Sequence, residues 1–330
     1  MERITLAHGD GGELAHQLIQ QLFVAHFHHD AFVKFDAALL SIEKGKLAIT
    51  TDSFVVKPLF FPGGNIGKLA VVGTVNDLAV SGAIPKAITC GFILEEGFPI
   101  SDLKRIVQSM AEEAQKIGVA IVAGDTKVVE RGAADGIYIN TTGIGIVEEP
   151  LVPSFQEGDS VIISGSVGDH GITIFAARGE LGLMTNLTSD CAALSPMISQ
   201  ATKASKQIRI MRDPTRGGLA TALVEICEDF QLTIELSEDA IPIKREVEGA
   251  CDLLGFDPLY LANEGKVIFI VAKEDEQKVL QAIRSREEGK EAAVIGTVRA
   301  TEKGQLLLRT PLGTTRRLYR LTGLLLPRIC

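Results

Sequence analysis

The chain has 330 residues, a formal net charge of −9 at pH 7 and a hydrophobic fraction of 46%, with only 5% aromatic residues and no Trp. The negative charge argues against a nucleic-acid-binding protein, and no apolar run approaches the length that crosses a membrane. A core of Val, Ile, Leu and Ala is typical of buried strands in an α/β protein, and the length allows two domains of ordinary size.

The first 150 residues mix strands and helices without a strict alternation of the two. In chain order, the pattern predicts a strand over 46–52, a helix over 71–81, a strand over 86–94, a helix over 101–116, and strands over 119–123 and 136–147. Ser101 is placed to cap the second helix. This order favours α+β layering as much as a doubly wound sheet.

A second domain is expected after the polar segment 148–150. In chain order, the pattern predicts a strand over 160–164, a loop over 165–171, a helix over 172–178, a strand over 207–211, a helix over 219–228 and a strand over 267–272. We therefore expect an N-terminal domain over 1–150, a C-terminal domain over 151–320 and a flexible tail over 321–330.

The cysteines and histidines indicate a reducing compartment and no metal cluster. The five cysteines form no CxxC pair and are odd in number, which is typical of a cytosolic protein, and Cys90 and Cys227 are interpreted as core residues. His26, His28 and His29 are interpreted as a solvated helix end, because no Cys or further His is near enough to complete a site. The first twelve residues lack the apolar run of a signal peptide, so we expect a cytoplasmic location.

The last residue of the chain, Cys330, carries a thiol. Such a thiol can be loaded by one partner, moved into an active site and unloaded by another, although a chance residue on a frayed end is the ordinary alternative. Segment 301–330 contains six basic residues against one acid. Pro327 restricts the backbone before the thiol, so the tail is expected to thread a narrow channel, and Arg328 is expected to steer it toward phosphates.

Four acids, Asp52, Asp77, Asp125 and Asp213, each lie at an expected strand end or helix start. Together in one cleft their carboxylates would repel one another unless a cation stood between them. Carboxylate oxygens of this kind select Mg²⁺, which shares its remaining positions with water and phosphate oxygens. The sequence thus suggests a magnesium and phosphate site.

Three glycine-rich turns, at 8–12, 165–171 and 213–218, could bring backbone N–H groups close to phosphates. The last two lead directly into expected helices, whose N-termini favour anions. No single turn is specific, because Gly-Asp turns are common and most are ordinary Asx turns. Neither a P-loop nor a dinucleotide-binding GxGxxG motif is present.

Taken together, four segments are specific: TVNDLAVSGAIPKAIT at 74–89, AGDTKVV at 123–129, RDPTRGGLATAL at 212–223 and LANEGKV at 261–267. In this order they resemble the ATP-binding superfamily of aminoimidazole ribonucleotide synthetase, selenophosphate synthetase and thiamine-monophosphate kinase. With HGDGG near the start and PRIC at the end, the chain is similar to the hydrogenase maturation members of that superfamily. The resemblance covers essentially the whole length.

The resemblance implies a two-domain, aminoimidazole ribonucleotide synthetase-like α/β (α+β) fold. The N-terminal sheet would pair across a homodimer, the C-terminal domain would be α+β, and ATP would lie in the cleft. The implied reaction is ATP-dependent dehydration of a carbamoyl group, carried as a thiocarbamate on Cys330, to a thiocyanate. A HypF-type carbamoyltransferase would load the thiol, and the cyano group would pass to iron on a HypC–HypD-type complex for a [NiFe] hydrogenase.

The resemblance also implies roles for individual residues. Glu264 would take the carboxamide proton, and Lys127 would hold the γ-phosphate or the carboxamide oxygen; without the resemblance we would interpret them as a loop acid and a solvated lysine. Mg²⁺ would be held by Asp52, Asp77, Asp125 and Asp213. ATP would be organised by Asp52, Asn76, Asp77, Asp125, Thr126, Gly168, Asp169, His170, Asp213, Arg216 and Gly217.

Two alternatives stay open. One is a superfamily enzyme acting on a free small molecule, of the selenophosphate or aminoimidazole type. No Cys precedes Cys90, so the early glycine-rich segment lacks the reactive thiol expected of a selenide enzyme, and a free substrate leaves Cys330 unexplained. The other is a non-enzymatic, ATP-gated scaffold that uses the tail only for docking; retention of ATP hydrolysis in Glu264→Gln would favour it.

Overall fold

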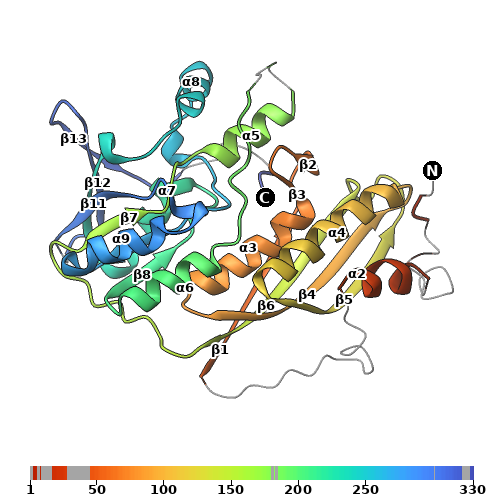
Figure 1. The fold of residues 1–330 in the computed structure, drawn as a ribbon. Coiled ribbons are helices and arrows are strands. Elements are labelled where there is room, and N and C mark those ends of the chain that lie inside the picture. Colours follow the sequence, from red (N-terminus) through yellow and green to blue (C-terminus); the bar gives the residue numbers. More distant parts are fainter. Residues whose placement is uncertain are drawn as a thin grey trace.

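A computed structural model of the chain describes residues 3–5, 8, 17–27, 45–179, 182, 185–300, 302–321 and 328–330. Its described part contains a four-stranded sheet, a seven-stranded sheet and a short pair of strands, β2 (Phe60–Phe61) and β3 (Gly64–Asn65). Helices cover both sheets, and the C-terminal residues lie between the two sheets near β2 and β3 (Figure 1). This mixed architecture confirms the expected α/β (α+β) fold class.

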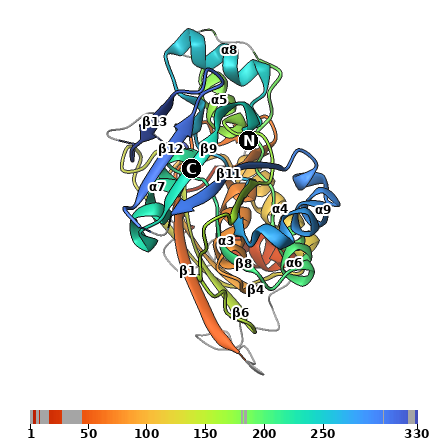
Figure 2. The same cartoon turned by 90° about the vertical axis from the view of Figure 1, so that its left-hand side faces the viewer.

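The four-stranded sheet has the order β1-β6-β4-β5, in which only β4 and β5 are parallel. Its strands are β1 (Lys46–Phe54), β4 (Ile84–Glu95), β5 (Ala120–Val129) and β6 (Ile137–Val147). Strands β1 and β5 therefore lie at opposite edges of the sheet, and β1 extends below the seven-stranded sheet in the side view (Figure 2).

One face of this sheet is covered by α3 (Ile66–Val80) and α4 (Ile100–Ile117). Asn65 caps α3 by accepting hydrogen bonds from the backbone N–H groups of Gly67 and Lys68. A Cβ at Gly67 would lie 2.4 Å from the carbonyl oxygen of Ile106 in α4, so glycine permits the close approach of the two helices. Helix α3 is apolar nearly all round because α6 packs beside it as well.

The opposite face of the sheet carries exposed apolar side chains. Leu47, Ile49, Ile84 and Ile93 remain exposed, and the register places all four on this face. We call it the open face. A single-chain soluble fold normally buries such a surface, so the open face needs an explanation.

The seven-stranded sheet has the order β13-β12-β9-β11-β7-β10-β8, and only β12 and β9 are parallel neighbours. Its strands are β7 (Ser160–Ile163), β8 (Ile208–Arg212), β9 (Thr233–Ser237), β10 (Ile268–Val271), β11 (Ala293–Ala300), β12 (Gln305–Arg309) and β13 (Thr315–Leu318). The remaining α-helices are α2 (Ala25–Phe27), α5 (Asp169–Ala177), α6 (Ser195–Ala204), α7 (Gly218–Phe230), α8 (Arg245–Leu254) and α9 (Glu276–Arg284).

Both faces of this larger sheet are buried at β7 and β10, and alternation along β10 divides its apolar side chains between them. Ile268 and Ile270 pack with α7, whereas Phe269 and Val271 pack with α6 and α9. The strand therefore reads as a continuous apolar run. Short π- and 3₁₀-helical segments join the elements at Ile19–Val24, Glu238–Ala240, Pro258–Tyr260, Lys273–Asp275 and Glu287–Gly289.

The predicted elements are found within a few residues of their expected bounds, with one informative exception. The strand expected over 119–123 continues to Val129, so Asp125 and Lys127 lie inside β5 and not in a loop after it. The reason is pairing: β5 forms a parallel ladder with β4 from Ala120 to Val129. An edge strand can carry polar side chains on a face that is not covered.

No helix in the described ranges is long and apolar enough to span a bilayer.

Candidate active site

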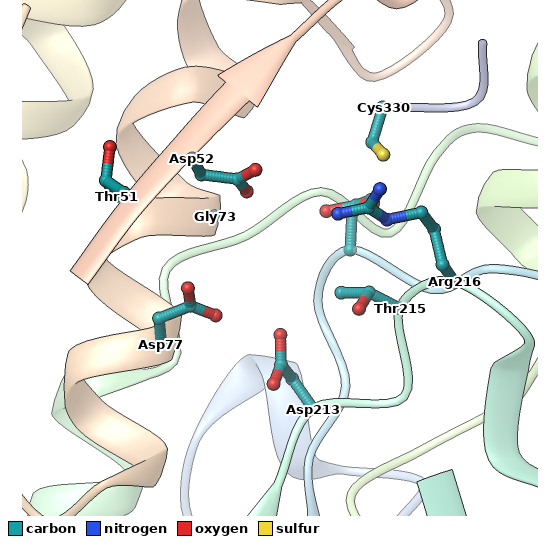
Figure 3. A pocket seen from close by; sticks show the side chains of 9 residues that line it. Thr51, Asp52, Gly73, Asp77, Asp213, Thr215, Arg216 and Cys330 are labelled. Carbon is teal, nitrogen blue, oxygen red and sulfur yellow. The ribbon is translucent and has the colours of Figure 1, made fainter. Parts of the chain in front are cut away.

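A pocket between the two sheets collects acids from distant parts of the chain. It is lined by Thr51, Asp52, Gly73, Asp77, Asp213, Thr215, Arg216, Glu264 and Cys330. The carboxylates of the three aspartates and the thiol of Cys330 point into one space, beside the Arg216 guanidinium (Figure 3).

Each aspartate comes from a different element. Asp52 lies on β1, Asp77 on the facing side of α3, and Asp213 directly after β8. Asp77 accepts a hydrogen bond from the Thr50 hydroxyl at 2.9 Å, and Asp52 accepts one from the backbone N–H of Ser53 at 2.8 Å. These contacts fix the two carboxylates toward the pocket.

Burial makes ionisation of these three aspartates unfavourable in the absence of a cation. Burial raises the pKa of Asp52 and of Asp77. Burial and the neighbouring charge of Asp77 raise the pKa of Asp213 to about 6. Arg216 opposes the shift at Asp52 and Asp77 but does not cancel it. The pocket therefore has an excess of negative charge once its aspartates ionise.

This donor set fits Mg²⁺. Three carboxylates whose pKa values burial raises, with the charge of Asp52 adding to the shifts of the other two, offer hard oxygen ligands with unused capacity. As they stand, no three His, Cys, Asp or Glu side chains of the described residues are close enough to form a complete metal cage. Magnesium does not require one, because it usually keeps several water and phosphate ligands.

Glu264 lies on the other side of the pocket, in the loop before β10. Its Oε1 atom is buried and has no hydrogen-bond partner in the described structure. Burial, followed by the charges of Asp190 and Asp213, raises the pKa of Glu264 well above its usual range. A buried carboxyl with an unused oxygen at a pocket wall is suited to exchange a proton with a ligand.

The loop that carries Glu264 is held by Asp190, which the sequence reasoning missed. Asp190 accepts hydrogen bonds from the backbone N–H groups of Glu264 (3.1 Å, at Oδ1) and Gly265 (3.3 Å, at Oδ2), and the Nζ atom of Lys266 lies 3.2 Å from the same Oδ2. A Cβ at Gly265 would lie 1.8 Å from the Asp190 carbonyl oxygen, so only glycine allows this approach. Asp190 belongs to no motif in the sequence, and no local signal could have identified it.

Asn76 belongs to the same buried support. Its Nδ2 donates to the carbonyl oxygens of Ala192 (3.0 Å) and Glu264 (3.4 Å), and its Oδ1 accepts from the Leu194 backbone N–H. Asn76 thus ties α3 to the loop beside Glu264. The structure places it behind the pocket wall and not among the lining residues.

The end of the chain lies against the residues that follow β1. The backbone N–H of Val55 donates to the Cys330 carbonyl at 3.0 Å, and that of Lys57 donates to the Arg328 carbonyl at 3.3 Å. This antiparallel pairing places the Cys330 side chain at the pocket. The expectation that Arg328 points toward phosphates is wrong for this arrangement, because its guanidinium contacts Asp135 and the Val55 carbonyl.

His170 contacts the tail directly. Its ring is buried, with Nε2 2.8 Å from the Ile329 carbonyl and Nδ1 2.8 Å from the Ser189 hydroxyl. A carbonyl only accepts, so Nε2 carries the proton and, in the neutral ring, Nδ1 accepts from Ser189. Burial lowers the pKa of His170, which favours this neutral form.

Several predicted site residues lie elsewhere in this chain. Asp125 and Lys127 form an exposed ion pair of 3.0 Å on the open face, and Thr126 between them also lies outside the pocket. The cause is register: Asp52 points to the helix-covered face, whereas Asp125 and Lys127 point away from it. The predicted acids of the first half therefore divide between two faces.

Of the two glycine-rich turns in the second half of the chain, only the turn at 213–218 reaches the pocket, and the turn at 165–171 does not. Asp169 is buried with Lys244 at 2.6 Å, and the Gly168 N–H donates to Asn263, so neither lines the pocket. Gly217, with φ of 77°, is the N-cap residue of α7 and follows Arg216 at the pocket wall. Only the turn at 213–218 thus presents a helix N-terminus beside the acids.

Some predictions lie outside the described residues, namely those on His28, His29, Pro327 and most of the turn at 8–12. His26, which is described, contacts the Leu22 carbonyl of its own helix at 2.7 Å.

Comparison with known proteins gives a consistent result. Residues 34–147 match the N-terminal domain and residues 156–309 the C-terminal domain of AIR synthase related proteins. Carbamoyl dehydratase HypE of Rhodobacter capsulatus is 47% identical, with 100% of this chain and 98% of the relative covered. HypE of Escherichia coli (strain K12) is 46% identical, with both chains fully covered. A solved structure of HypE in complex with ATP matches with a TM-score of 0.94 at 44% identity, covering 99% of both chains.

Proposed function

The chain belongs to the HypE family of carbamoyl dehydratases within the AIR synthase related proteins, and from that premise we propose how its residues carry out the reaction. It is an ATP-dependent carbamoyl dehydratase of hydrogenase maturation. We place the carbamoyl group on Cys330, as a thiocarbamate that the enzyme converts to a thiocyanate. The observation that carries this assignment is the position of the terminal thiol in the same pocket as Glu264 and three aspartates.

The chemistry requires the carboxamide oxygen to leave. ATP converts this oxygen into a phosphate ester, and both N–H protons are lost as the C–N triple bond forms and inorganic phosphate departs. The products are the thiocyanate, ADP and phosphate. Phosphoryl transfer needs positive charge aimed at the moving phosphoryl group, and Arg216 beside the α7 N-terminus supplies it in this pocket.

Mg²⁺ would be held by Asp52, Asp77 and Asp213, and it would neutralise phosphate charge during transfer. The three acids also influence Glu264, because their charges contribute to its raised pKa. Neutralisation of these acids would lower the pKa of Glu264 and so increase the population of its ionised form, which is the form that accepts a proton. We assign to Glu264 the removal of a carboxamide proton.

We propose that the protein is a homodimer joined through the open face. The exposed side chains of Leu47, Ile49 and Ile93 support this pairing, since it would bury them. Asp125 and Lys127 lie on the same face, so the dimer would carry them to the interface. There they could contribute to a nucleotide site shared with the partner chain, which keeps their assigned roles in ATP binding and catalysis.

The proposed partners follow from the chemistry of a terminal carrier. A HypF-type carbamoyltransferase would load Cys330, and a HypC–HypD-type complex would receive the cyano group on iron. A solved structure titled as a HypE–HypF complex, whose matching chain is 46% identical with a TM-score of 0.81 and coverage of 92% and 99%, supports the first partner.

Mass spectrometry tests this function. The protein is incubated with its loading partner, carbamoyl phosphate and ATP, and Cys330→Ser serves as the control. We expect a carbamoyl adduct on Cys330 that loses the mass of one water only when ATP is hydrolysed. An unmodified Cys330 beside an active loading partner would contradict the proposal and favour an ATP-gated scaffold.

A further inference from the structure

The tail is anchored at a point outside the pocket, where one carboxylate meets two cations. Asp135 contacts the guanidinium of Arg328 and, at 2.9 Å, the Nζ atom of Lys57. Both contacts use the same oxygen, Oδ2. Arg328 comes from the tail, whereas Lys57 belongs to the segment against which the tail pairs.

Asp135 is presented by a loop that is itself braced. The Glu95 carboxylate accepts hydrogen bonds from the backbone N–H groups of Gly132 (2.6 Å) and Gly136 (2.9 Å), on either side of Asp135. The contacts with Lys57 and Arg328 lower the pKa of Asp135, so the carboxylate is ionised at neutral pH. The loop thus holds a fixed negative charge beside the segment against which the tail pairs.

Contacts around Asp135 fix the backbone and side-chain conformation of Arg328. Its backbone has φ of 51°, in the left-handed region that a bulky residue adopts only where contacts hold it. Its Nε donates to the Val55 carbonyl at 2.8 Å, its guanidinium lies 5.9 Å from the Tyr138 ring centroid, and Arg178 donates to its carbonyl at 3.0 Å. These contacts precede Cys330 by two residues and fix where the thiol can reach.

We propose that Asp135 is an exchangeable latch: it positions Cys330 in the pocket through Arg328, and Lys57 takes over its carboxylate when the tail leaves. The inference deepens the proposed function, because a carrier thiol has to dock for dehydration and leave for loading and delivery. A latch with a second cation in place suits this cycle. Departure of Arg328 does not leave Asp135 without a counter-charge, so undocking is less costly than breaking an isolated pair.

Thiol alkylation measures docking without relying on the enzymatic reaction. The other four cysteines are buried, so iodoacetamide should alkylate Cys330 first. The rate of alkylation is measured by intact mass spectrometry, and Cys330→Ser gives the background rate. Asp135→Asn removes the latch while keeping the side-chain shape. We expect alkylation to accelerate roughly two- to fivefold, the range of a partly exposed ion pair. Asp135→Glu should restore slow alkylation.

Lys57→Met provides the opposite test. Its side chain is 60% exposed, so the change should not disturb folding, and the backbone N–H that binds the tail remains. Without the second cation, Asp135 has only Arg328, and we expect alkylation to slow by a similar factor. A merely structural pair would make both variants faster. Asp102→Asn, which removes an Asp–Arg contact of 3.6 Å on α4, is the matched control and should change nothing.

Single-turnover dehydration of loaded protein separates this inference from the proposed function. If the latch is correct, Asp135→Asn slows dehydration of Cys330-bound carbamoyl without changing the ATP concentration that gives half the maximal rate. No dehydration in the parent protein would overturn the proposed function, and the alkylation result would still decide on the latch. Unchanged alkylation in Asp135→Asn would overturn the latch, and faster alkylation in Lys57→Met would overturn the exchange.

Discussion

The carboxyl of Glu264 and the thiol of Cys330 line one pocket, and Glu264 is, after burial itself, the main cause that raises the pKa of Cys330 to about 12. The pocket therefore holds the tail as a neutral thiol. A thiocarbamate on the same sulfur is also uncharged, so the loaded tail can dock without an ionisation cost. The position that Cys330 occupies in the pocket therefore favours a bound thiocarbamate over a free thiolate.

The first prediction concerns the ionisation of Cys330. A free tail would ionise near the ordinary value of 9.0, whereas the docked thiol resists ionisation up to about pH 12. Docking is therefore expected to weaken as pH rises from 9 toward 12, because only the undocked tail loses its proton in that window. The thiolate absorbance of the parent protein minus that of Cys330→Ser measures the apparent pKa. A value at or below 9.0 would show that the tail does not rest in this pocket.

The second prediction concerns Glu264→Gln. The amide cannot accept the carboxamide proton, so dehydration of preloaded Cys330 should slow by roughly a hundredfold to ten-thousandfold. Loading should proceed as in the parent, since it takes place on another protein. Rapid-quench mass spectrometry of the loaded protein after ATP addition gives the rate, and Glu149→Gln at an exposed ion pair is the control. Full activity in Glu264→Gln would remove its assigned role.

The third prediction compares two glycines. Gly265→Ala would place a Cβ 1.8 Å from the Asp190 carbonyl oxygen, so the loop that carries Glu264 must move. We expect a loss of about 1–3 kcal/mol in the free energy of unfolding and a strong loss of dehydration. Thermal or denaturant unfolding measures the first quantity.

Gly249→Ala is the matched control for that change. Gly249 lies in the exposed interior of α8, and an added Cβ would meet no atom within 4 Å. This variant should gain about 0.5–1 kcal/mol through helix propensity, with normal activity. Equal behaviour of the two variants would contradict the described geometry around Glu264.

The fourth prediction concerns Mg²⁺ and pH. Asp213 has its pKa raised to about 6, so in the metal-free protein it opposes folding increasingly as pH rises from 3.8 to about 6. Mg²⁺ binds the ionised acids, and its stabilising effect should grow over the same window. At a hundredfold excess over Kd the gain is about 2.7 kcal/mol. Thermal unfolding with and without Mg²⁺ at two pH values checks this.

Asp213→Asn should reduce that gain at pH 8 and leave the effect of Mg²⁺ at pH 4 nearly unchanged, since the folded protein holds this acid protonated at pH 4 and a protonated acid does not bind Mg²⁺. A stabilisation by Mg²⁺ that is equal at both pH values would contradict a site built from these carboxylates.

Much of the fold was predictable because its signals are local. Helix α4 alternates apolar and polar residues at helical period, and β1 and β10 have the composition of strands, so their positions follow from a few neighbouring residues. The extent of β5 was not predictable in this way. Gly124 and Asp125 are poor strand residues, and only pairing with β4 keeps them extended. Here tertiary pairing decides over local preference.

The site was predictable in part for the same reason. Motif segments identified Asp77, Asp213, Glu264 and Cys330, and the end of an expected strand identified Asp52. All five line one pocket. Their supports could not be found: Asp190 and Asp135 belong to no motif, and they act through contacts with residues about 75 and 193 positions away. No single-sequence pattern reports contacts over such separations.

The central claim is that ATP removes the carbonyl oxygen of a group carried on Cys330, and the fate of that oxygen tests it most directly. The thiol is loaded with a carbamoyl group whose carbonyl oxygen is isotopically heavy, and ATP is then added for a single turnover. We predict that the heavy oxygen appears in inorganic phosphate, while the adduct on Cys330 decreases from the mass of the labelled carbamoyl group to that of a cyano group. Heavy oxygen found in water or retained on Cys330, with unlabelled phosphate released, would contradict the account.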